Sequence, residues 1–294
     1  MKKILGILLF ISLALNANAQ LLWKITGNGL EKPSYVFGTH HLAPLSIKDS
    51  IAAMPQALLE TSQIYGEVVM ADMMTPAFMQ EMQKNMMLPA DTTLQSLFTP
   101  EQYEQVGKVV KENLMADISM LAQLKPAAIM QQLVVILSMK YLPGFNPQEQ
   151  IDAYFQQQAQ QKGKKVGGLE TAQSQLEVLF NSQSLRRQAE LLFCIASSIE
   201  KTMKQSKELV DCYKAQDLDG VLRLMEEREG TSCDPQPDEM KALLDNRNIA
   251  WMKKMPAIMQ ENPTLFVVGA GHLPGDNGVL NLLKQQGYTV EPMK

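Results

Sequence analysis

The chain has 294 residues, of which 20% are charged and 46% are hydrophobic, and 27 basic side chains stand against 31 acidic ones. This is ordinary globular composition, long enough to bury a sizeable core. The net charge of −4 argues against a nucleic-acid-binding protein, which would show a basic surplus. Beyond the N-terminal segment, no run of 18 uninterrupted apolar residues suggests a membrane span.

The N-terminus has the pattern of a secretory signal peptide. Two lysines precede an apolar run at residues 4–15, and the small residues Ala17 and Ala19 occupy the −3 and −1 positions before Gln20. This pattern predicts a signal peptide at 1–19 and an exported chain, periplasmic or secreted, that begins at Gln20. The alternative is an N-terminal anchor helix, for which the apolar run is short. After cleavage we expect no transmembrane segment.

Short strand-like runs lie near both ends of the mature chain. The first two predict a hairpin, and the clearest run, at 265–268, precedes a Gly-rich turn and a helix at 278–286. Strands that alternate with helices predict an α/β (α+β) fold with a mostly parallel sheet. The expected strands are 21–26, 35–37, 64–69, 165–169, 265–268 and 288–290.

The middle of the chain shows helix-period apolar residues and few strand signals. Helices are expected at 51–61, 75–87, 100–113, 118–139, 147–161, 171–229 and 238–259. We therefore predict one domain over residues 20–294, with a sheet core made of two similar halves from the two chain ends. The core is expected at about 20–72, 163–172 and 262–294, and large helical insertions at about 73–162 and 173–261.

The three histidines of the chain occupy two similar contexts. Residues 35–44 read YVFGTHHLAP and residues 266–274 read FVVGAGHLP, so each has three apolar residues, then G-x-x-H-L and a nearby proline. Such a pattern is typical of a strand that ends in a tight turn, where glycine permits unusual backbone angles. The turn residues are Gly38, Thr39, Gly269 and Gly271.

Ligands of open α/β sheets bind at the carboxyl ends of the strands, which is where these turns place their histidines. We expect His41 and His272 to point into one crevice. His40 is expected on the opposite side, because neighbouring side chains alternate along an extended segment, although it could also join the site. Two neutral imidazoles that face each other suit a divalent metal.

Two acidic residues stand at predicted strand ends, where a core would favour apolar side chains. Glu67 lies in the apolar run 64–69, and Glu170 follows the run 165–169. Because buried acids are almost always paired or coordinating, both are candidate metal ligands, and Glu67 is also a candidate general base. For Glu170 the alternative is a cap on the helix that follows.

At these residues the chain resembles the TraB/GumN family, which is related to the Tiki proteins described as metal-dependent peptidases. The resemblance covers about residues 20–294, and the pair of G-x-x-H motifs at opposite ends carries most of its specificity. The matching segments are LWKI at 22–25, GTHH at 38–41, Glu67, GLET at 168–171, Arg247-Asn248 and VGAGHL at 268–273.

The resemblance implies a metal-dependent hydrolase that acts on a peptide or protein, with His41 and His272 near the metal. Manganese or cobalt is favoured by the Tiki branch, with zinc as an alternative. In the expected mechanism the metal lowers the pKa of a bound water and Glu67 accepts its proton. Arg247 would bind a substrate carboxylate or the developing oxyanion, or else pair with Asp245 on a helix surface. Asn248 is a possible accessory residue of the same site.

Other interpretations remain open. A non-catalytic envelope protein could sequester a peptide, haem or metal in the same crevice, since fold alone does not settle chemistry. The run GAGHLP at 269–274, with Glu291 after it, imitates a dinucleotide fingerprint, but Pro274 replaces the last glycine. The methionine cluster at 70–87 is interpreted as apolar packing or a binding groove, with Cu(I) binding as the weaker alternative.

The cysteines are Cys194, Cys212 and Cys233, so at least one thiol is free. We expect that Cys212 and Cys233 could pair, and that Cys194, within an apolar helical run, is buried. No C-x-x-C motif is present, which argues against thiol redox chemistry and a cysteine-only zinc site.

Overall fold

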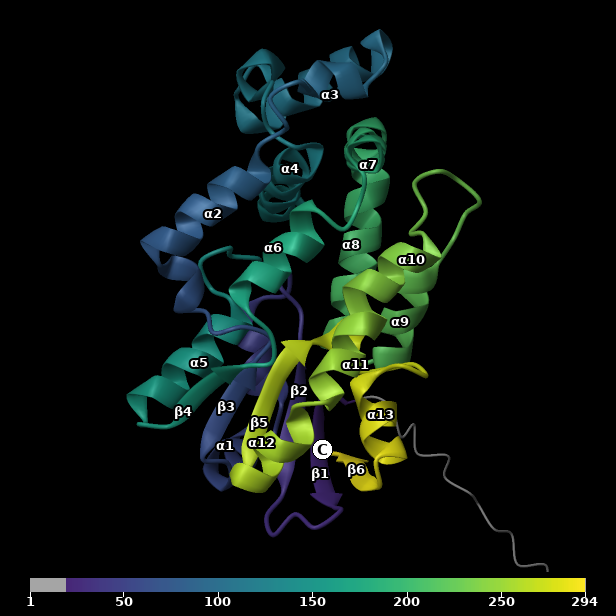
Figure 1. The fold of residues 1–294 in the computed structure, drawn as a ribbon. Helices are drawn as coiled ribbons and strands as arrows, with labels where there is room; N and C mark the ends of the chain where they lie inside the picture. The colour runs from purple at the N-terminus through teal and green to yellow at the C-terminus, as the bar shows by residue number, and fades with distance from the viewer. Residues whose placement is uncertain (1–19, 294) are drawn as a thin grey trace, which may run out of the picture.

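A computed structural model describes residues 20–293, and the predicted signal peptide at 1–19 lies outside the described residues. A six-stranded sheet lies at one end of the molecule, and a tall body of helices rises from one edge of it (Figure 1). The strands follow the order β4-β3-β5-β2-β1-β6. They are β1 (Leu22–Gly27), β2 (Ser34–Thr39), β3 (Gln63–Gly66), β4 (Lys165–Gly168), β5 (Thr264–Gly269) and β6 (Tyr288–Pro292).

The sheet is mostly parallel, as predicted. Strands β4, β3, β5 and β2 run parallel to one another, whereas β1 is antiparallel to both β2 and β6. The predicted hairpin of β1 and β2 is confirmed. In the β2–β5 pair, Thr39 lies opposite Gly269. The two G-x-x-H turns therefore leave neighbouring strands side by side, although more than 200 residues separate them in the chain.

The two central strands form the middle of the main core. All of Ser34–Thr39 and Thr264–Val268 are buried, which explains why β2 and β5 read as continuous apolar runs rather than alternating ones. Helix α5 (Ile151–Gln161) packs on β3 and β4, and α13 (Val279–Gln285) packs on β6. The short helices α1 (Met54–Glu60) and α12 (Met255–Glu261) also add side chains to this core.

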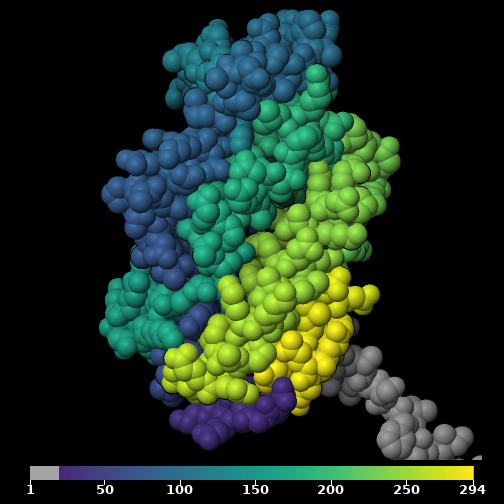
Figure 2. All heavy atoms as spheres, viewed as in Figure 1, coloured from purple at the N-terminus to yellow at the C-terminus, as the bar shows by residue number. Residues whose placement is uncertain are grey.

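The helical body has an apolar core of its own, centred on buried side chains such as Leu94, Val110, Leu133 and Leu192. Figure 2 shows the blue and teal segments stacked above the purple and yellow ones. The predicted helix 118–139 is two elements, because Pro126 begins a new helix after a 3-10 turn at Ile118–Leu121. The long run 171–229 is broken into four helices. The body contains α2 (Pro76–Met86), α3 (Pro100–Leu114), α4 (Pro126–Tyr141), α6 (Ala172–Phe180), α7 (Leu185–Ser197), α8 (Ile199–Lys214) and α9 (Leu218–Glu226).

The chain returns to the sheet through a helix with an irregular middle. Helix α10 (Pro237–Met240) continues into a π-helical segment, η5 (Lys241–Asp245), and then into α11 (Asn246–Met252). A π-helical turn holds one more residue than an α-helical turn and is often found next to functional sites. Helix α11 carries Arg247 and Asn248.

The disulfide joins Cys194 of α7 to Cys233 of the loop before α10, so the expected pairing of Cys212 with Cys233 is wrong. Cys212 is a free, partly buried thiol that packs against the main core. The Cys212 side chain on α8 points toward α9, where a Cβ on Gly220 would lie 3.0 Å from the Cys212 sulfur. The loop with Cys233 folds back on α7 instead.

Among residues 20–293, no helix is long and apolar enough to cross a membrane.

Candidate active site

The guanidinium of Arg247 lies between the two strand-end carboxylates. Glu67 directly follows β3, and Glu170 follows β4 by two residues. Arg247 donates from Nε to both oxygens of Glu170, at 3.2 Å each, and from Nη2 to Glu67 Oε2 at 2.5 Å. Nη2 also pairs with Glu170 Oε1. Each of the three side chains is only 11% exposed, so this is a buried ion-pair cluster and not a helix-surface pair with Asp245.

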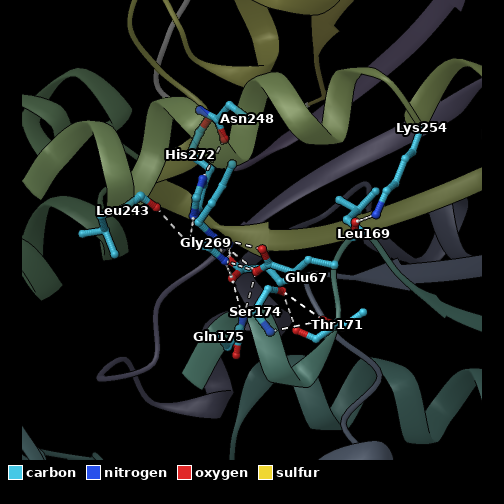
Figure 3. Close-up of polar contacts among 12 residues, drawn as sticks. Glu67, Leu169, Thr171, Ser174, Gln175, Leu243, Asn248, Lys254, Gly269 and His272 are labelled. Carbon is cyan, nitrogen blue, oxygen red and sulfur yellow. Dashed lines mark hydrogen bonds and ion pairs between the residues drawn. The ribbon is translucent and has the colours of Figure 1, made fainter. Parts of the chain in front are cut away.

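His272 completes the cluster from the other motif. Arg247 Nη1 lies 2.9 Å from His272 Nε2, and Glu67 Oε1 lies 3.8 Å from the same nitrogen. On the far side of the ring, His272 Nδ1 lies 2.7 Å from Asn248 Oδ1 (Figure 3). Since the Asn248 oxygen can only accept, it selects the tautomer with a proton on Nδ1 and leaves a lone pair on Nε2.

Asn248 is itself fixed by two further hydrogen bonds. Its Nδ2 donates to the His272 carbonyl at 3.2 Å and to the Asn277 carbonyl at 2.8 Å. The ring of Trp251, one turn further along α11, packs on the His272 ring with centroids 4.4 Å apart. The same indole lies 5.1 Å from the Arg247 guanidinium carbon. Helix α11 therefore orients both the histidine and the arginine.

The protonation states follow from burial and from these partners. Burial alone would raise the pKa of Glu67, but His272, Arg247 and the Gly269 amide outweigh it and lower the pKa to about 2. Burial lowers the pKa of His272 to about 4; Glu67 opposes this shift and Arg247 adds to it. At neutral pH the site therefore holds an ionised carboxylate beside a neutral imidazole. The permanent charge of Arg247 keeps Glu67 ionised when His272 is neutral.

The glycines of the two motifs allow close approaches. The Gly269 amide donates to Glu67 Oε1 at 2.8 Å, and a Cβ on Gly269 would lie 3.2 Å from that oxygen. A Cβ on Gly38 would lie 2.9 Å from the Leu273 side chain and 3.1 Å from the Ala270 backbone. Gly38 therefore lets the end of β2 meet the second G-x-x-H turn.

His41 lies at the mouth of a cavity beside this cluster and does not point into a closed crevice. Its side chain is 68% exposed, and its Nδ1 lies 3.6 Å from Asp152 Oδ2. The cavity holds about 190 Å³, and its lining includes His41, Glu67 and Asp152. The charge of His41 influences the pKa values of both Glu67 and His272, so the three side chains lie within electrostatic range of one another.

The more buried residue of the pair is His40, and the expectation that His41 faces inward through strand alternation is wrong. Strand β2 ends at Thr39, and the chain then turns, so alternation no longer applies. The His40 ring packs edge-on against Tyr213, and its Nδ1 accepts from the Leu42 amide at 3.1 Å. Burial, with a contribution from His41, lowers the pKa of His40 to about 4.

Sequence reasoning missed three residues of the site. Gln175 donates to Glu67 Oε2 at 3.1 Å and to Glu170 Oε1 at 3.3 Å, and Trp251 packs on His272. Asp152 is buried at the start of α5 and accepts from the Thr39 hydroxyl at 3.1 Å. Burial raises the pKa of Asp152. One signal was available for Asp152: it is an acid among the apolar residues of a helix start.

The candidate metal ligands have suitable chemistry but are not gathered as a metal cluster. His272 offers an Nε2 lone pair fixed by Asn248, and Glu67 is ionised, which suits a divalent cation. The positively charged guanidinium of Arg247 already lies between Glu67, Glu170 and His272, where a metal ion would have to bind. In the described part of the chain, no group of three His, Cys, Asp or Glu side chains is close enough together to hold a metal ion.

The fold and site define an α/β protein with a buried carboxylate, imidazole and guanidinium cluster at the carboxyl ends of parallel strands. The chain belongs to the TraB/PrgY/gumN family, whose pattern matches residues 21–292.

Its curated relatives include Metalloprotease TIKI1 of Danio rerio, which is 24% identical over 92% of this chain and 62% of the relative. Metalloprotease TIKI2 of Danio rerio is 23% identical, over 92% of this chain and 60% of the relative. Metalloprotease TIKI1 of Homo sapiens is 24% identical, over 92% and 61%. The chain thus spans about three fifths of the length of these relatives. No solved structure gives a significant match.

Proposed function

We propose that this protein is an exported metal-dependent hydrolase that cleaves peptide bonds at the cluster of Glu67, Glu170, Arg247 and His272. The observation that carries the proposal is the ionised Glu67 beside a neutral His272 whose tautomer is selected by Asn248. Curated relatives that bear the name metalloprotease support the reaction class. The Cys194–Cys233 disulfide supports an oxidising compartment.

The residues that would hold the metal are His41, Glu67, Glu170 and His272, two imidazoles and two carboxylates. A divalent ion, manganese or cobalt with zinc as an alternative, would supply Lewis acidity and a water of lowered pKa. It would compete with the Arg247 guanidinium for Glu67, Glu170 and His272, since all three already bind that cation.

Glu67 is the residue of the chain that we assign to proton transfer. Glu67 lines the cavity, and its carboxylate accepts from the Gly269 amide at Oε1 and from Gln175 at Oε2. With a pKa lowered to about 2, Glu67 is a weak base. It would therefore accept a proton only from an attacking water whose own pKa is lowered. Arg247, which pairs with Glu67 and Glu170, would stabilise negative charge that develops next to them.

The test combines metal binding with turnover on the wild-type protein and Glu67→Gln. We expect the wild type to bind about one Mn²⁺, Co²⁺ or Zn²⁺ by titration calorimetry and to cleave members of a quenched peptide library only with metal. Glu67→Gln should lose cleavage, whereas Glu261→Gln, which changes an exposed glutamate paired with Lys165, should keep it. Metal or peptide binding without any cleavage would contradict the hydrolase and favour a binding protein.

A further inference from the structure

The cavity beside Glu67 contains a buried carboxylate oxygen that has no hydrogen-bond donor. Asp152 uses Oδ1 to accept from Thr39, but Oδ2 is buried and accepts no hydrogen bond within the described residues. His41 Nδ1 lies 3.6 Å from Oδ2, which is beyond hydrogen-bond length. A buried acceptor of this kind is costly unless a ligand supplies the donor.

The remaining walls of the cavity are of two kinds. Val68, Met70 and Met73 supply an apolar side, and Met thioethers adapt to straight alkyl chains. Three glutamine side chains complete the lining. Of the charged residues that line it, Glu67 is already paired with Arg247, whereas Asp152 faces only His41, the one basic residue of the lining.

We infer that this cavity is a subsite for the side chain of a lysine in the substrate, with the methylenes against Met70 and Met73 and the ammonium donating to Asp152 Oδ2. Lysine combines an apolar stem with a compact head that carries three donors, which matches one apolar wall and one unpaired acceptor. A cavity of about 190 Å³ has room for one such side chain. The inference rests on the proposed function only where it calls the lysine part of a substrate; the binding of a lysine side chain does not depend on that function.

The test is a binding measurement on the metal-free full chain, so it needs neither metal nor turnover. The methionine methyl groups are labelled with ¹³C, and the signals of Met70 and Met73 are assigned with Met70→Leu and Met73→Leu. The probes are Nα-acetyl-lysine N-methylamide and its norleucine counterpart, which has the same four side-chain carbons and no ammonium. The lysine probe should shift both signals and bind about ten-fold more tightly than norleucine.

Asp152→Asn keeps the shape of the side chain and should abolish the lysine preference. Asp72→Asn is the matched control, because Asp72 is exposed, lies between Met70 and Met73 in the chain, and does not line the cavity. Equal affinities for lysine and norleucine in the wild type would overturn the inference without reference to any variant. A lysine preference that survives in Asp152→Asn would also overturn it.

A third probe separates the two sources of an ammonium group. Norleucine amide with a free α-amino group should bind no better than the acetylated norleucine probe. If it binds more tightly than the lysine probe, the cavity takes a chain terminus and the lysine subsite is wrong. Lysine binding without peptide cleavage would support the subsite while it contradicts the proposed hydrolase, so the two failures are distinguishable.

Discussion

The backbones of Glu67 and Glu170 are hydrogen-bonded to each other: the Glu170 amide donates to the Glu67 carbonyl at 2.8 Å. This bond continues the β3–β4 pairing beyond the last residues of both strands. The backbone positions of the two glutamates are therefore held by the sheet independently of Arg247. A cation that replaced the guanidinium would meet two carboxylates that extend from fixed backbone positions.

Arg247→Met should destabilise the protein at pH 7, because it leaves two buried carboxylates without their common partner. We expect a loss of about 3–5 kcal/mol in the free energy of unfolding, measured by urea denaturation. Under the proposed function, millimolar Mn²⁺ should restore part of this loss in the variant and stabilise the wild type less. Arg186→Met, at an exposed position of α7, should change little. An Arg247→Met variant as stable as the wild type would argue against the cluster.

Asn248→Ala should lower the affinity for a divalent metal by about 10- to 100-fold, because His272 loses the acceptor that fixes its tautomer. Calorimetric titration with Mn²⁺ and Zn²⁺ measures the change. Asn277→Ala is the matched control, since Asn248 binds only the backbone carbonyl of Asn277. If both variants bind metal as the wild type does, Asn248 does not position a ligand.

Stability should fall as the pH drops from about 6.5 to about 4, because His40 and His272 are held neutral in the folded state. Their pKa values are lowered on folding, so the unfolded chain binds protons first and acid favours unfolding. His40→Asn should reduce this acid-induced loss by up to about 3 kcal/mol, from a pKa lowered from 6.5 to about 4. Denaturation at pH 7.5 and pH 4.5 measures the difference. His41→Asn should keep most of this loss, because burial is the larger cause of both shifts and only the smaller contribution of the His41 charge is removed.

Cys194→Ser should lower the free energy of unfolding by about 2–4 kcal/mol, because the disulfide closes a loop with a sequence separation of 39 residues. Reduction with dithiothreitol should lower the melting temperature of the wild type to that of the variant. Cys212→Ala removes the free thiol and should leave the response to reductant intact. A Cys194→Ser variant whose melting temperature still falls in reductant would contradict the Cys194–Cys233 disulfide.

The strands and their end residues could be predicted because their signals are local. Continuous apolar runs mark β2 and β5, and a G-x-x-H pattern follows each run. The expected turn positions of Gly38 and Gly269 are wrong, because both glycines lie in the last residues of their strands and neither has a positive φ. Glu67 and Glu170 stand out as acids next to buried strands. None of these signals depends on knowing which segments meet in space.

The partners of these residues could not be predicted in the same way. Asp152 and Gln175 lie on helices that reach the site only through packing, and Trp251 reads as an ordinary core residue. The disulfide depends on how the loop before α10 folds on α7. The orientation of His41 was wrong because the prediction extended strand geometry past Thr39, where the chain already turns.

The π-helical segment η5 ends at Asp245, two residues before Arg247 on the same continuous helix. Each residue of an α-helix turns the chain by about 100°, so the extra residue of a π turn resets the direction of everything after it. The number of residues in this segment, more than their identity, thus sets the direction in which Arg247, Asn248 and Trp251 point. Single substitutions at its exposed positions should be tolerated, whereas deletion of one residue would rotate all three side chains away from His272.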